Sequence, residues 1–332
     1  MTTSSTQKPD ADMQAVLDQL AKLGGKPIPT LTPVEARKQP SPADAVKALL
    51  KARGQSAAPE KVGDVDNRSI DGPAGKIKVR VYTPKGDGPF PVILYFHGGG
   101  FVIADLDTYD SSPRVLANAA QAVVVSIHYR QGPEHKFPAA DEDAFAAYQW
   151  TLAHAAEIGG DPHRIAVAGE SAGGNLAAGV CIMAREQGVQ LPVHQLLVYP
   201  VTDSRTDTAS YIENTNAKPL SKPLMEWFFK HAAEPADATN PRLAVLRTPN
   251  FAGLPPATII TAQIDPLRSE GEALGKELTA AGVPVEYRNY DGVTHEFFGM
   301  GAVLPKARAA VEFAAEQLRQ AFLAPETAQA RH

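Results

Sequence analysis

The chain has 332 residues, of which 44% are hydrophobic and 21% are charged, and its formal net charge is -5. This length suits one large α/β domain with an insertion, or two modest domains. The mild acidity leaves no basic patch of the size that nucleic acid requires, so we expect no nucleic-acid partner.

Cysteine usage and hydropathy favour a cytoplasmic protein. The single cysteine, Cys181, excludes an intrachain disulfide and a cysteine-based zinc site, and we interpret it as a core residue. The first ten residues hold no apolar stretch of the kind that a signal peptide needs. No run of about 18 apolar residues occurs either, so we expect no membrane span.

The first 60 residues carry two short amphipathic helices, predicted over Met13–Leu23 and Pro42–Arg53. Between them the proline-rich passage Lys26–Pro33 is predicted to be extended. Neither helix can bury its apolar side alone, so both must pack on another part of the chain. We therefore predict that residues 1–60 form an N-terminal helical cap segment, with a linker as the alternative.

From about residue 61 the pattern changes to short apolar strands that alternate with helices. The first strand alternates apolar and polar residues, whereas the later strands are nearly all apolar. This pattern predicts an α/β fold with a mostly parallel central sheet and helices on both faces. The predicted strands are Lys76–Tyr82, Pro91–Phe96, Ala122–Ile127, Arg164–Ala168, Gln195–Pro200, Ala257–Ala262 and Val283–Tyr290. The predicted helices include Ala139–Ile158, Ala172–Gln187 and Ser269–Ala281.

Residues 203–256 interrupt this alternation. No strand is predicted there, and the segment is too long for a plain connection. It contains an aromatic helix, predicted over Lys222–His231. We predict that residues 203–256 are an inserted cap segment that the N-terminal helices join in space. Residues 61–202 and 257–324 then form the main α/β domain.

The sequence Gly169-Glu-Ser-Ala-Gly173 fits the G-x-S-x-G pattern of a nucleophile elbow. A strand is predicted just before it and a helix just after it, so the turn must be tight and would expose the hydroxyl of Ser171. The start of the helix places the amide of Ala172 and a positive dipole end beside a developing oxyanion. An ordinary glycine-rich turn is the alternative.

His97-Gly-Gly-Gly-Phe101 follows a predicted strand. Consecutive glycines let backbone N–H groups point into a cavity, as an oxyanion hole requires. An HGGG-type loop and a nucleophile elbow occur together in one fold, so each motif supports the other. We predict that Gly99, Gly100 and Ala172 donate to an oxyanion and that His97 braces the loop. A flexible turn is the alternative.

A serine nucleophile needs a base, and the base needs an orienting carboxylate. His295 follows the last predicted strand and Asp265 follows the strand before it, at the carboxyl ends where α/β sheets place their sites. The order serine, aspartate, histidine fits the elbow pattern. Asp203, which follows another strand, is a serious rival for the acid, and Glu270 is a weaker one.

Together these motifs resemble the hormone-sensitive lipase-like (family IV) esterases of bacteria. The resemblance implies the α/β-hydrolase fold with a helical cap, and hydrolysis of short-chain acyl esters by a Ser-His-Asp triad without cofactor or metal. It also favours Asp265 over Asp203. It extends over roughly residues 60–320 and rests on four motifs: His97–Phe101, Gly169–Gly174, Asp265–Gly271 and the segment at His295.

Two segments depart from that family's pattern. Glu170 stands where the family more often has Asp, and we assign it a supporting role in the elbow. His128–Glu134 reads His-Tyr-Arg-Gln-Gly-Pro-Glu, where the family has Asp-Tyr-Arg-Leu-Ala-Pro-Glu. We interpret this segment as structural support for the loops of the site.

The substrate expected from the resemblance is a small-molecule ester. Its pocket is predicted to be bounded by the N-terminal helices and by aromatic residues, although the same side chains would also serve as plain cap core: Phe101, Trp227, Phe228 and Phe297. Amide hydrolysis or acyl transfer on the same triad is the alternative activity. A non-catalytic receptor is disfavoured because the base His295 is present. Family members often dimerise through edge strands, which makes residues 283–290 the candidate homodimer contact; a monomer with this edge exposed is the alternative.

Overall fold

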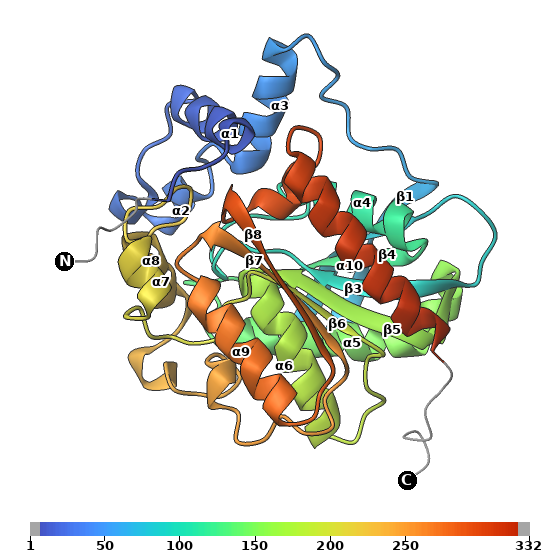
Figure 1. Cartoon of the computed structure of the whole chain (residues 1–332). Coiled ribbons are helices and arrows are strands. Elements are labelled where there is room, and N and C mark those ends of the chain that lie inside the picture. Colours follow the sequence, from blue (N-terminus) through green and yellow to red (C-terminus); the bar gives the residue numbers. More distant parts are fainter. Residues whose placement is uncertain (1–6, 325–332) are drawn as a thin grey trace.

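A computed structural model of the protein describes residues 7–324 (Figure 1). Its centre is one eight-stranded sheet in the order β1-β2-β4-β3-β5-β6-β7-β8. β2 pairs antiparallel with β1 and with β4, and every other neighbouring pair is parallel. The strands are β1 Asp64–Gly72, β2 Gly75–Thr83, β3 Phe90–Phe96, β4 Val123–His128, β5 Gly160–Glu170, β6 Gln195–Val198, β7 Ala257–Ile264 and β8 Val285–Thr294.

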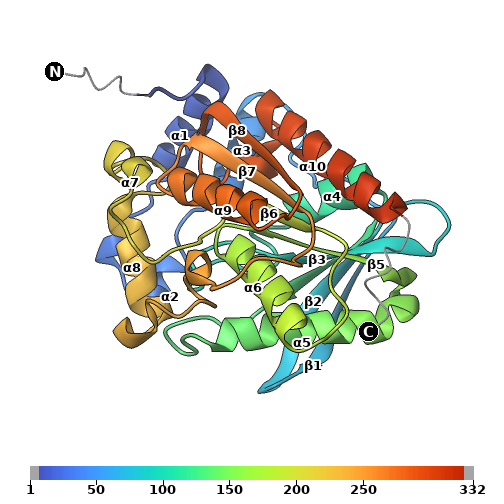
Figure 2. The same cartoon turned by 60° about the horizontal axis from the view of Figure 1, so that its bottom comes forward.

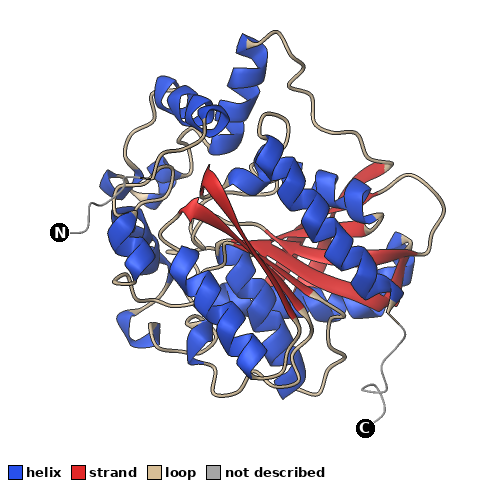
Figure 3. Ribbon diagram, viewed as in Figure 1, coloured by secondary structure: helices blue, strands red, loops and turns tan. Residues whose placement is uncertain are grey.

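Helices cover both faces of the sheet (Figures 2 and 3). One face carries α4 and α10, whose apolar residues share a core with Ile93 and Tyr95 of β3. The other carries α5, α6 and α9, which share a core with Leu94 and Phe96 of the same strand. The helices are α4 Ser111–Ala120, α5 Ala139–His154, α6 Ala172–Glu186, α9 Arg268–Ala280 and α10 Pro305–Leu323. Burial on both faces explains why the central strands are continuously apolar.

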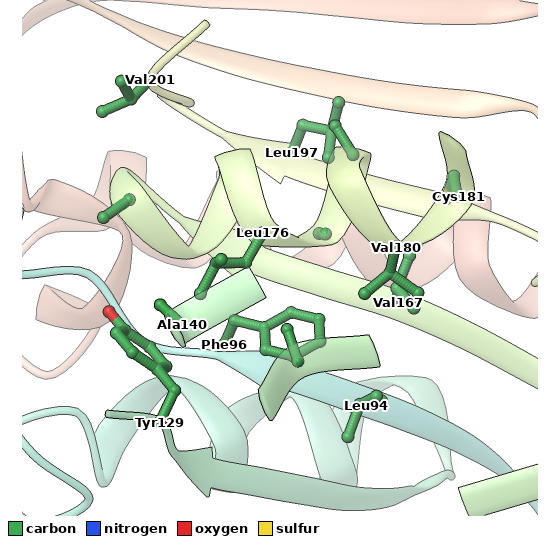
Figure 4. Packing of buried hydrophobic residues seen from close by; sticks show 14 of the residues in the cluster. Leu94, Phe96, Tyr129, Ala140, Val167, Leu176, Val180, Cys181, Leu197 and Val201 are labelled. Atoms are coloured by element: carbon green, nitrogen blue, oxygen red, sulfur yellow. The ribbon is translucent and has the colours of Figure 1, made fainter. Parts of the chain in front are cut away.

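The core between the sheet and α6 is seen from close by in Figure 4. Leu94 and Val167 of the sheet share this core with Leu176, Val180 and Cys181 of α6, and all five are almost completely buried. Cys181 is thus a core residue, as predicted. None of the described helices is both long and apolar enough to cross a membrane.

Two segments outside the sheet domain lie side by side (Figures 1 and 2). The N-terminal segment holds α1 Ala11–Lys22, α2 Pro33–Ala36 and α3 Pro42–Ala52, and the inserted segment holds α7 Ala209–Glu213 and α8 Lys222–Ala232. The indole N–H of Trp227 in α8 donates to the carbonyl oxygen of Leu31 at 3.1 Å. Residues 1–6 of the segment predicted as 1–60 lie outside the described residues.

The structure corrects three details of the prediction. β1 was not expected, because only Ile70 of its nine residues is buried and an edge strand of this kind has little apolar alternation. The passage Lys26–Pro33 is not extended throughout: it turns at Ile28–Thr30, and α2 begins at Pro33 after a capping box between Thr32 and Glu35. The last strand runs later than 283–290, ending at Thr294.

Candidate active site

Ser171 lies in the turn between β5 and α6, with φ 58° and ψ -117°. A residue with a side chain rarely adopts positive φ, so the surrounding fold must hold this conformation. The Ser171 N–H donates to the carbonyl oxygen of Val198 at 2.9 Å. A Cβ atom on Gly173 would lie 1.9 Å from the carbonyl oxygen of Phe96, so only glycine lets α6 begin this close to β3.

The structure brings the predicted base and acid to this serine. His295 Nε2 lies 3.0 Å from Ser171 Oγ, and His295 Nδ1 lies 2.6 Å from Asp265 Oδ2. The other carboxylate oxygen of Asp265 accepts the amide N–H of Leu267 at 2.9 Å. Burial lowers the pKa of His295, but the charge and hydrogen bond of Asp265 outweigh it, so that the pKa is raised overall.

The two rival acids bind other partners. Asp203 is buried and pairs with Arg205 Nε at 2.6 Å and with Arg247 Nε at 3.7 Å. Glu270 is buried too, accepts the amide N–H of Thr202 at 2.7 Å, and has a pKa raised well above its usual range by burial. Of the three carboxylates that the sequence offers as the acid, only Asp265 forms a hydrogen bond with the imidazole of His295.

The glycine-rich loop after β3 lines the same cavity as the serine. Gly99 and Gly100 have φ of 99° and 59°, which glycine adopts without strain. A Cβ atom on Gly99 would lie 2.2 Å from the carbonyl oxygen of Ile103. Among residues 7–324, the amide N–H groups of Gly99, Gly100 and Ala172 donate to no backbone carbonyl in the turns and loops. These N–H groups are therefore free to bind a substrate oxygen.

The carbonyl groups of the same loop are bound on its outer side. The Gly132 N–H donates to the Phe101 carbonyl at 2.9 Å, and Arg37 Nε donates to the Val102 carbonyl at 2.9 Å. Gln131 Nε2 donates to the next two carbonyls along the chain, at 2.8 Å and 3.0 Å. Four consecutive carbonyls are thus fixed by the segment 128–134 and by one arginine of the N-terminal segment. Arg37 was missed because nothing in the sequence near it marks its partner.

His97 is fully buried and braces the loop mainly by stacking. Its ring lies 4.4 Å from the ring of Tyr129, centroid to centroid, and its Nδ1 lies 2.7 Å from the Gly98 carbonyl oxygen. The Tyr129 hydroxyl donates to the His97 carbonyl at 2.8 Å. Burial, with a smaller contribution from His128, lowers the pKa of His97 to about 3, so the ring stays neutral near pH 7.

Glu170 supports the nucleophile elbow through hydrogen bonds with two buried tyrosines. Its carboxyl group accepts the Tyr95 hydroxyl at 2.5 Å and also the Tyr199 hydroxyl, and the Tyr199 ring lies 4.4 Å from that of His295. Burial, together with the nearby charge of Glu296, raises the pKa of Glu170 to about 7.

One large cavity opens onto these groups. It has a volume of about 1440 Å³, and Gly99, Gly100, Ser171 and His295 all line it. Its outer wall is formed by the N-terminal segment and by α8. Within the described part of the chain, no three His, Cys, Asp or Glu side chains lie close enough together to hold a metal ion.

Comparison with known proteins identifies the family. Residues 93–299 match the family described as alpha/beta hydrolase fold. The chain belongs to this family. The hydrolase is 46% identical to Esterase LipI of Mycobacterium tuberculosis over 72% of its own chain and 76% of that protein. It is 33% identical to an ethyl acetate hydrolase of Pseudomonas putida over 94% and 98% of the two chains.

Solved structures agree with these relatives. A hyperthermophilic esterase from the archaeon Pyrobaculum calidifontis superposes with a TM-score of 0.86 at 35% identity, covering 96% of this chain and 100% of the other. The predicted α/β-hydrolase fold and the resemblance to bacterial hormone-sensitive lipase-like esterases are thereby confirmed. The hydrolase is an ester hydrolase of the carboxylesterase type.

The predicted substrate pocket needs correction. Of its four aromatic residues only Phe228 lines the cavity. Phe297 is fully buried in the core beside Tyr199, Phe101 faces a separate small void, and the Trp227 indole is held by Leu31. The spacing of apolar residues in the sequence does not distinguish a side chain buried in the core from one that lines a pocket. Two polar residues of the cavity, Tyr109 and Glu296, were missed, although Glu296 adjoins His295 in sequence.

Glu170 makes the stability of the hydrolase depend on pH. Its pKa is raised from 4.5 to about 7 on folding, so its neutral form is favoured in the folded state. Its stabilising contribution is complete below about pH 4.5 and is lost as pH rises through about 7, on the order of 1 kcal/mol per pH unit. Urea unfolding between pH 5 and 7 should show this slope. Glu170→Gln should lower the total slope by about 1 kcal/mol per pH unit, while other buried carboxyl groups with a raised pKa, such as Asp141, keep their own share. The exposed Glu157→Gln is the control and should retain the slope; an equal slope in Glu170→Gln would contradict the assignment.

Gln131 is expected to support turnover through the oxyanion loop. Gln131→Leu removes two hydrogen bonds to loop carbonyls, worth about 0.5–1.5 kcal/mol each. Because the loop amides matter most in the transition state, kcat should fall about three- to tenfold while KM changes little. Steady-state kinetics on an aryl ester measures this. Gln320→Leu, on the exposed side of α10, is the control, and an unchanged kcat in Gln131→Leu would show that the loop needs no such brace.

Proposed function

We propose that Ser171 is the nucleophile of this ester hydrolase, with His295 as its base and Asp265 as the carboxylate that orients the imidazole. The observation that supports these roles is the pair of short contacts, 3.0 Å from Ser171 Oγ to His295 Nε2 and 2.6 Å from His295 Nδ1 to Asp265. A serine, a histidine and an aspartate joined in this order constitute a catalytic triad.

In the first half of the reaction Ser171 Oγ attacks the ester carbonyl carbon while its proton moves to His295 Nε2. Asp265 holds the other imidazole nitrogen and stabilises the imidazolium that forms. The tetrahedral intermediate then collapses, the ester C–O bond breaks, and the imidazolium gives its proton to the departing alcohol. Water hydrolyses the acyl-enzyme by the same relay in the second half.

The negative charge of each tetrahedral intermediate falls on the former carbonyl oxygen. We assign its binding to the free amides of Gly99, Gly100 and Ala172, the last of which opens α6 and adds the positive end of the helix dipole. Each such donor contributes about 3 kcal/mol to transition-state stabilisation in comparable sites. His97 acts as a positioning residue for the glycine-rich loop, and Glu170 acts as a positioning residue for the nucleophile elbow.

We assign residues 1–60 and 203–256 to a cap over this site, and we propose short-chain acyl esters as substrates. The Phe228 ring of α8 lies so close to Gly100 that a Cβ atom there would be 2.2 Å away from it, which restricts the space beside the oxyanion loop. A relative that matches nearly the whole chain is named ethyl acetate hydrolase, after a short acyl ester.

Three further proposals concern the setting of the enzyme. We place it in the cytoplasm, without a nucleic-acid partner, and we propose a homodimer formed through residues 283–290. β8 lies at one end of the sheet order, so within residues 7–324 one side of this strand has no neighbouring strand. Tyr287 on it is 38% exposed. An unpaired edge of this kind can pair with a second copy.

Ser171→Ala should abolish ester turnover, with a loss of at least about a thousandfold in kcat, because the nucleophile is removed. Spectrophotometric assay of an aryl acetate measures this, and a fluorophosphonate probe followed by mass spectrometry locates the modified residue in the wild type. Ser56→Ala, in an exposed loop, is the control and should keep full activity. Turnover retained by a folded Ser171→Ala protein would overturn the scheme.

Asp265→Asn and Asp203→Asn separate the two acids. Asp265→Asn should lower kcat by about 10³- to 10⁴-fold, since the amide favours the wrong tautomer of the imidazole. Asp203→Asn should cost far less activity per folded molecule, because its partners are arginines away from His295. Kinetics normalised to the circular dichroism of each variant decides between them. A larger loss in Asp203→Asn would reverse the assignment.

Acyl preference is measured on p-nitrophenyl acetate, butyrate, octanoate and dodecanoate. We expect kcat/KM to be highest for acetate or butyrate, and we expect Phe228→Ala to shift the preference toward longer chains by enlarging the space beside Gly100. Phe229→Ala, next in sequence but outside the cavity, is the matched control. A wild-type optimum at octanoate or beyond would contradict the short-chain proposal.

A further inference from the structure

A second carboxyl group lies beside the reactive nitrogen of His295. Glu296 Oε1 is 3.9 Å from His295 Nε2, on the nitrogen that faces Ser171 rather than the one that faces Asp265. The Tyr109 hydroxyl donates to the same oxygen of Glu296 at 2.5 Å and so fixes the carboxyl group. The triad described above does not use either residue.

The backbone at Glu296 is also unusual. Its φ is 72°, in the left-handed region that residues with side chains rarely occupy. Such conformations are kept where the surrounding structure holds them, and they are enriched in active sites. The side chain is 20% exposed and, with Tyr109, lines the same cavity as Ser171 and His295. Glu296 therefore presents an acceptor to the space in which a second reactant must approach the acyl-enzyme.

The other two carboxyl groups near His295 do not reach this space. Asp265 faces Nδ1 and accepts the Leu267 amide, and Glu170 accepts two tyrosine hydroxyls below the elbow. Neither group is among the residues that line the cavity. Glu296 is the carboxyl group on the Nε2 side that does so.

Deacylation requires a water molecule with its oxygen aimed at the acyl carbon. One water hydrogen points to His295 Nε2, which removes it as the oxygen attacks, and the second hydrogen needs an acceptor if the orientation is to be fixed. We propose that Glu296 accepts this second hydrogen, and thereby favours hydrolysis of the acyl-enzyme over transfer of the acyl group to an alcohol. The inference rests on the proposed roles of Ser171 and His295.

The chemistry of the two nucleophiles explains the selectivity. In both reactions a new C–O bond forms, the nucleophile's proton passes to His295 Nε2, the acyl–Ser171 bond breaks, and the proton returns to Ser171 Oγ. An alcohol carries only one hydroxyl hydrogen, and its alkyl group takes the place of the second hydrogen of water. Glu296 therefore offers a hydrogen bond to water and a polar, unfavourable neighbour to the alkyl group of an alcohol.

The test compares Glu296→Leu, Glu296→Gln and Tyr109→Phe with wild type on p-nitrophenyl acetate, with and without added methanol. Stopped-flow and steady-state assays give acylation, deacylation and the ratio of methyl acetate to acetate formed. In Glu296→Leu we expect kcat to fall about tenfold, kcat/KM to fall less than about threefold, and a burst of nitrophenol to appear. The transfer-to-hydrolysis ratio should rise about tenfold.

The conservative variant separates this role from a structural one. Glu296→Gln keeps an acceptor oxygen, so its transfer-to-hydrolysis ratio should stay closer to wild type than that of Glu296→Leu. Tyr109→Phe, which releases the carboxyl group, should raise the ratio to an intermediate value. If Glu296→Leu fails to fold, the other two variants still decide the question, because the ratio should stay close to wild type in Glu296→Gln and rise in Tyr109→Phe.

Two results would overturn the proposal. An unchanged ratio in both Glu296→Leu and Tyr109→Phe would show that Glu296 does not hold the water. An equal loss of kcat and kcat/KM without a burst would show that it acts on acylation instead. Failure of the proposed triad looks different, because the fluorophosphonate probe would then leave Ser171 of the wild-type enzyme unlabelled.

Discussion

The close approach between the start of α6 and the end of β3 is the constraint on which the site depends. Gly173 lies against the Phe96 carbonyl so tightly that a Cβ atom would be 1.9 Å from its oxygen. This contact sets the distance between the elbow and the loop that begins at His97. It therefore sets the start of α6, which includes Ala172, beside the chain that leads into the glycine-rich loop. A side chain at position 173 would push the elbow and the glycine-rich loop apart.

The carboxyl groups near His295 differ in their burial and in the groups that donate hydrogen bonds to them. Three carboxyl groups surround the imidazole, but each has a different donor: an amide for Asp265, two tyrosines for Glu170 and one tyrosine for Glu296. Burial raises the pKa of both glutamates, which limits the negative charge that the site must hold at once. The aspartate bonded to Nδ1 can then act as the partner of a developing imidazolium.

Much of this site could be predicted because its motifs are local. A tight turn needs glycines on both sides of Ser171, and a parallel sheet gathers the residues that follow its strands, so short windows of sequence carry the information. The pocket wall could not be predicted in this way. Whether Phe228 or Trp227 faces the cavity depends on how α8 packs on the N-terminal segment, roughly 200 residues away in the chain. β1 was not predicted because an edge strand buries few residues, so its sequence shows little alternation of apolar and polar residues.

The departures from the family's pattern at residues 131 and 132 form one arrangement. A Cβ atom on Gly132 would lie 2.2 Å from the carbonyl oxygen of His231, so glycine lets the end of α8 approach this segment. The same glycine donates to the Phe101 carbonyl, while Gln131 binds the two carbonyls that follow Val102. Arg37 completes the arrangement from the N-terminal segment, where it also forms an ion pair with Glu134. The N-terminal segment thus binds one carbonyl of the glycine-rich loop directly, and the end of α8 packs on the segment 128–134, which binds the other three. A displacement of Arg37 or of the end of α8 would therefore disturb the contacts that hold this loop, even though neither residue range contains a member of the proposed triad.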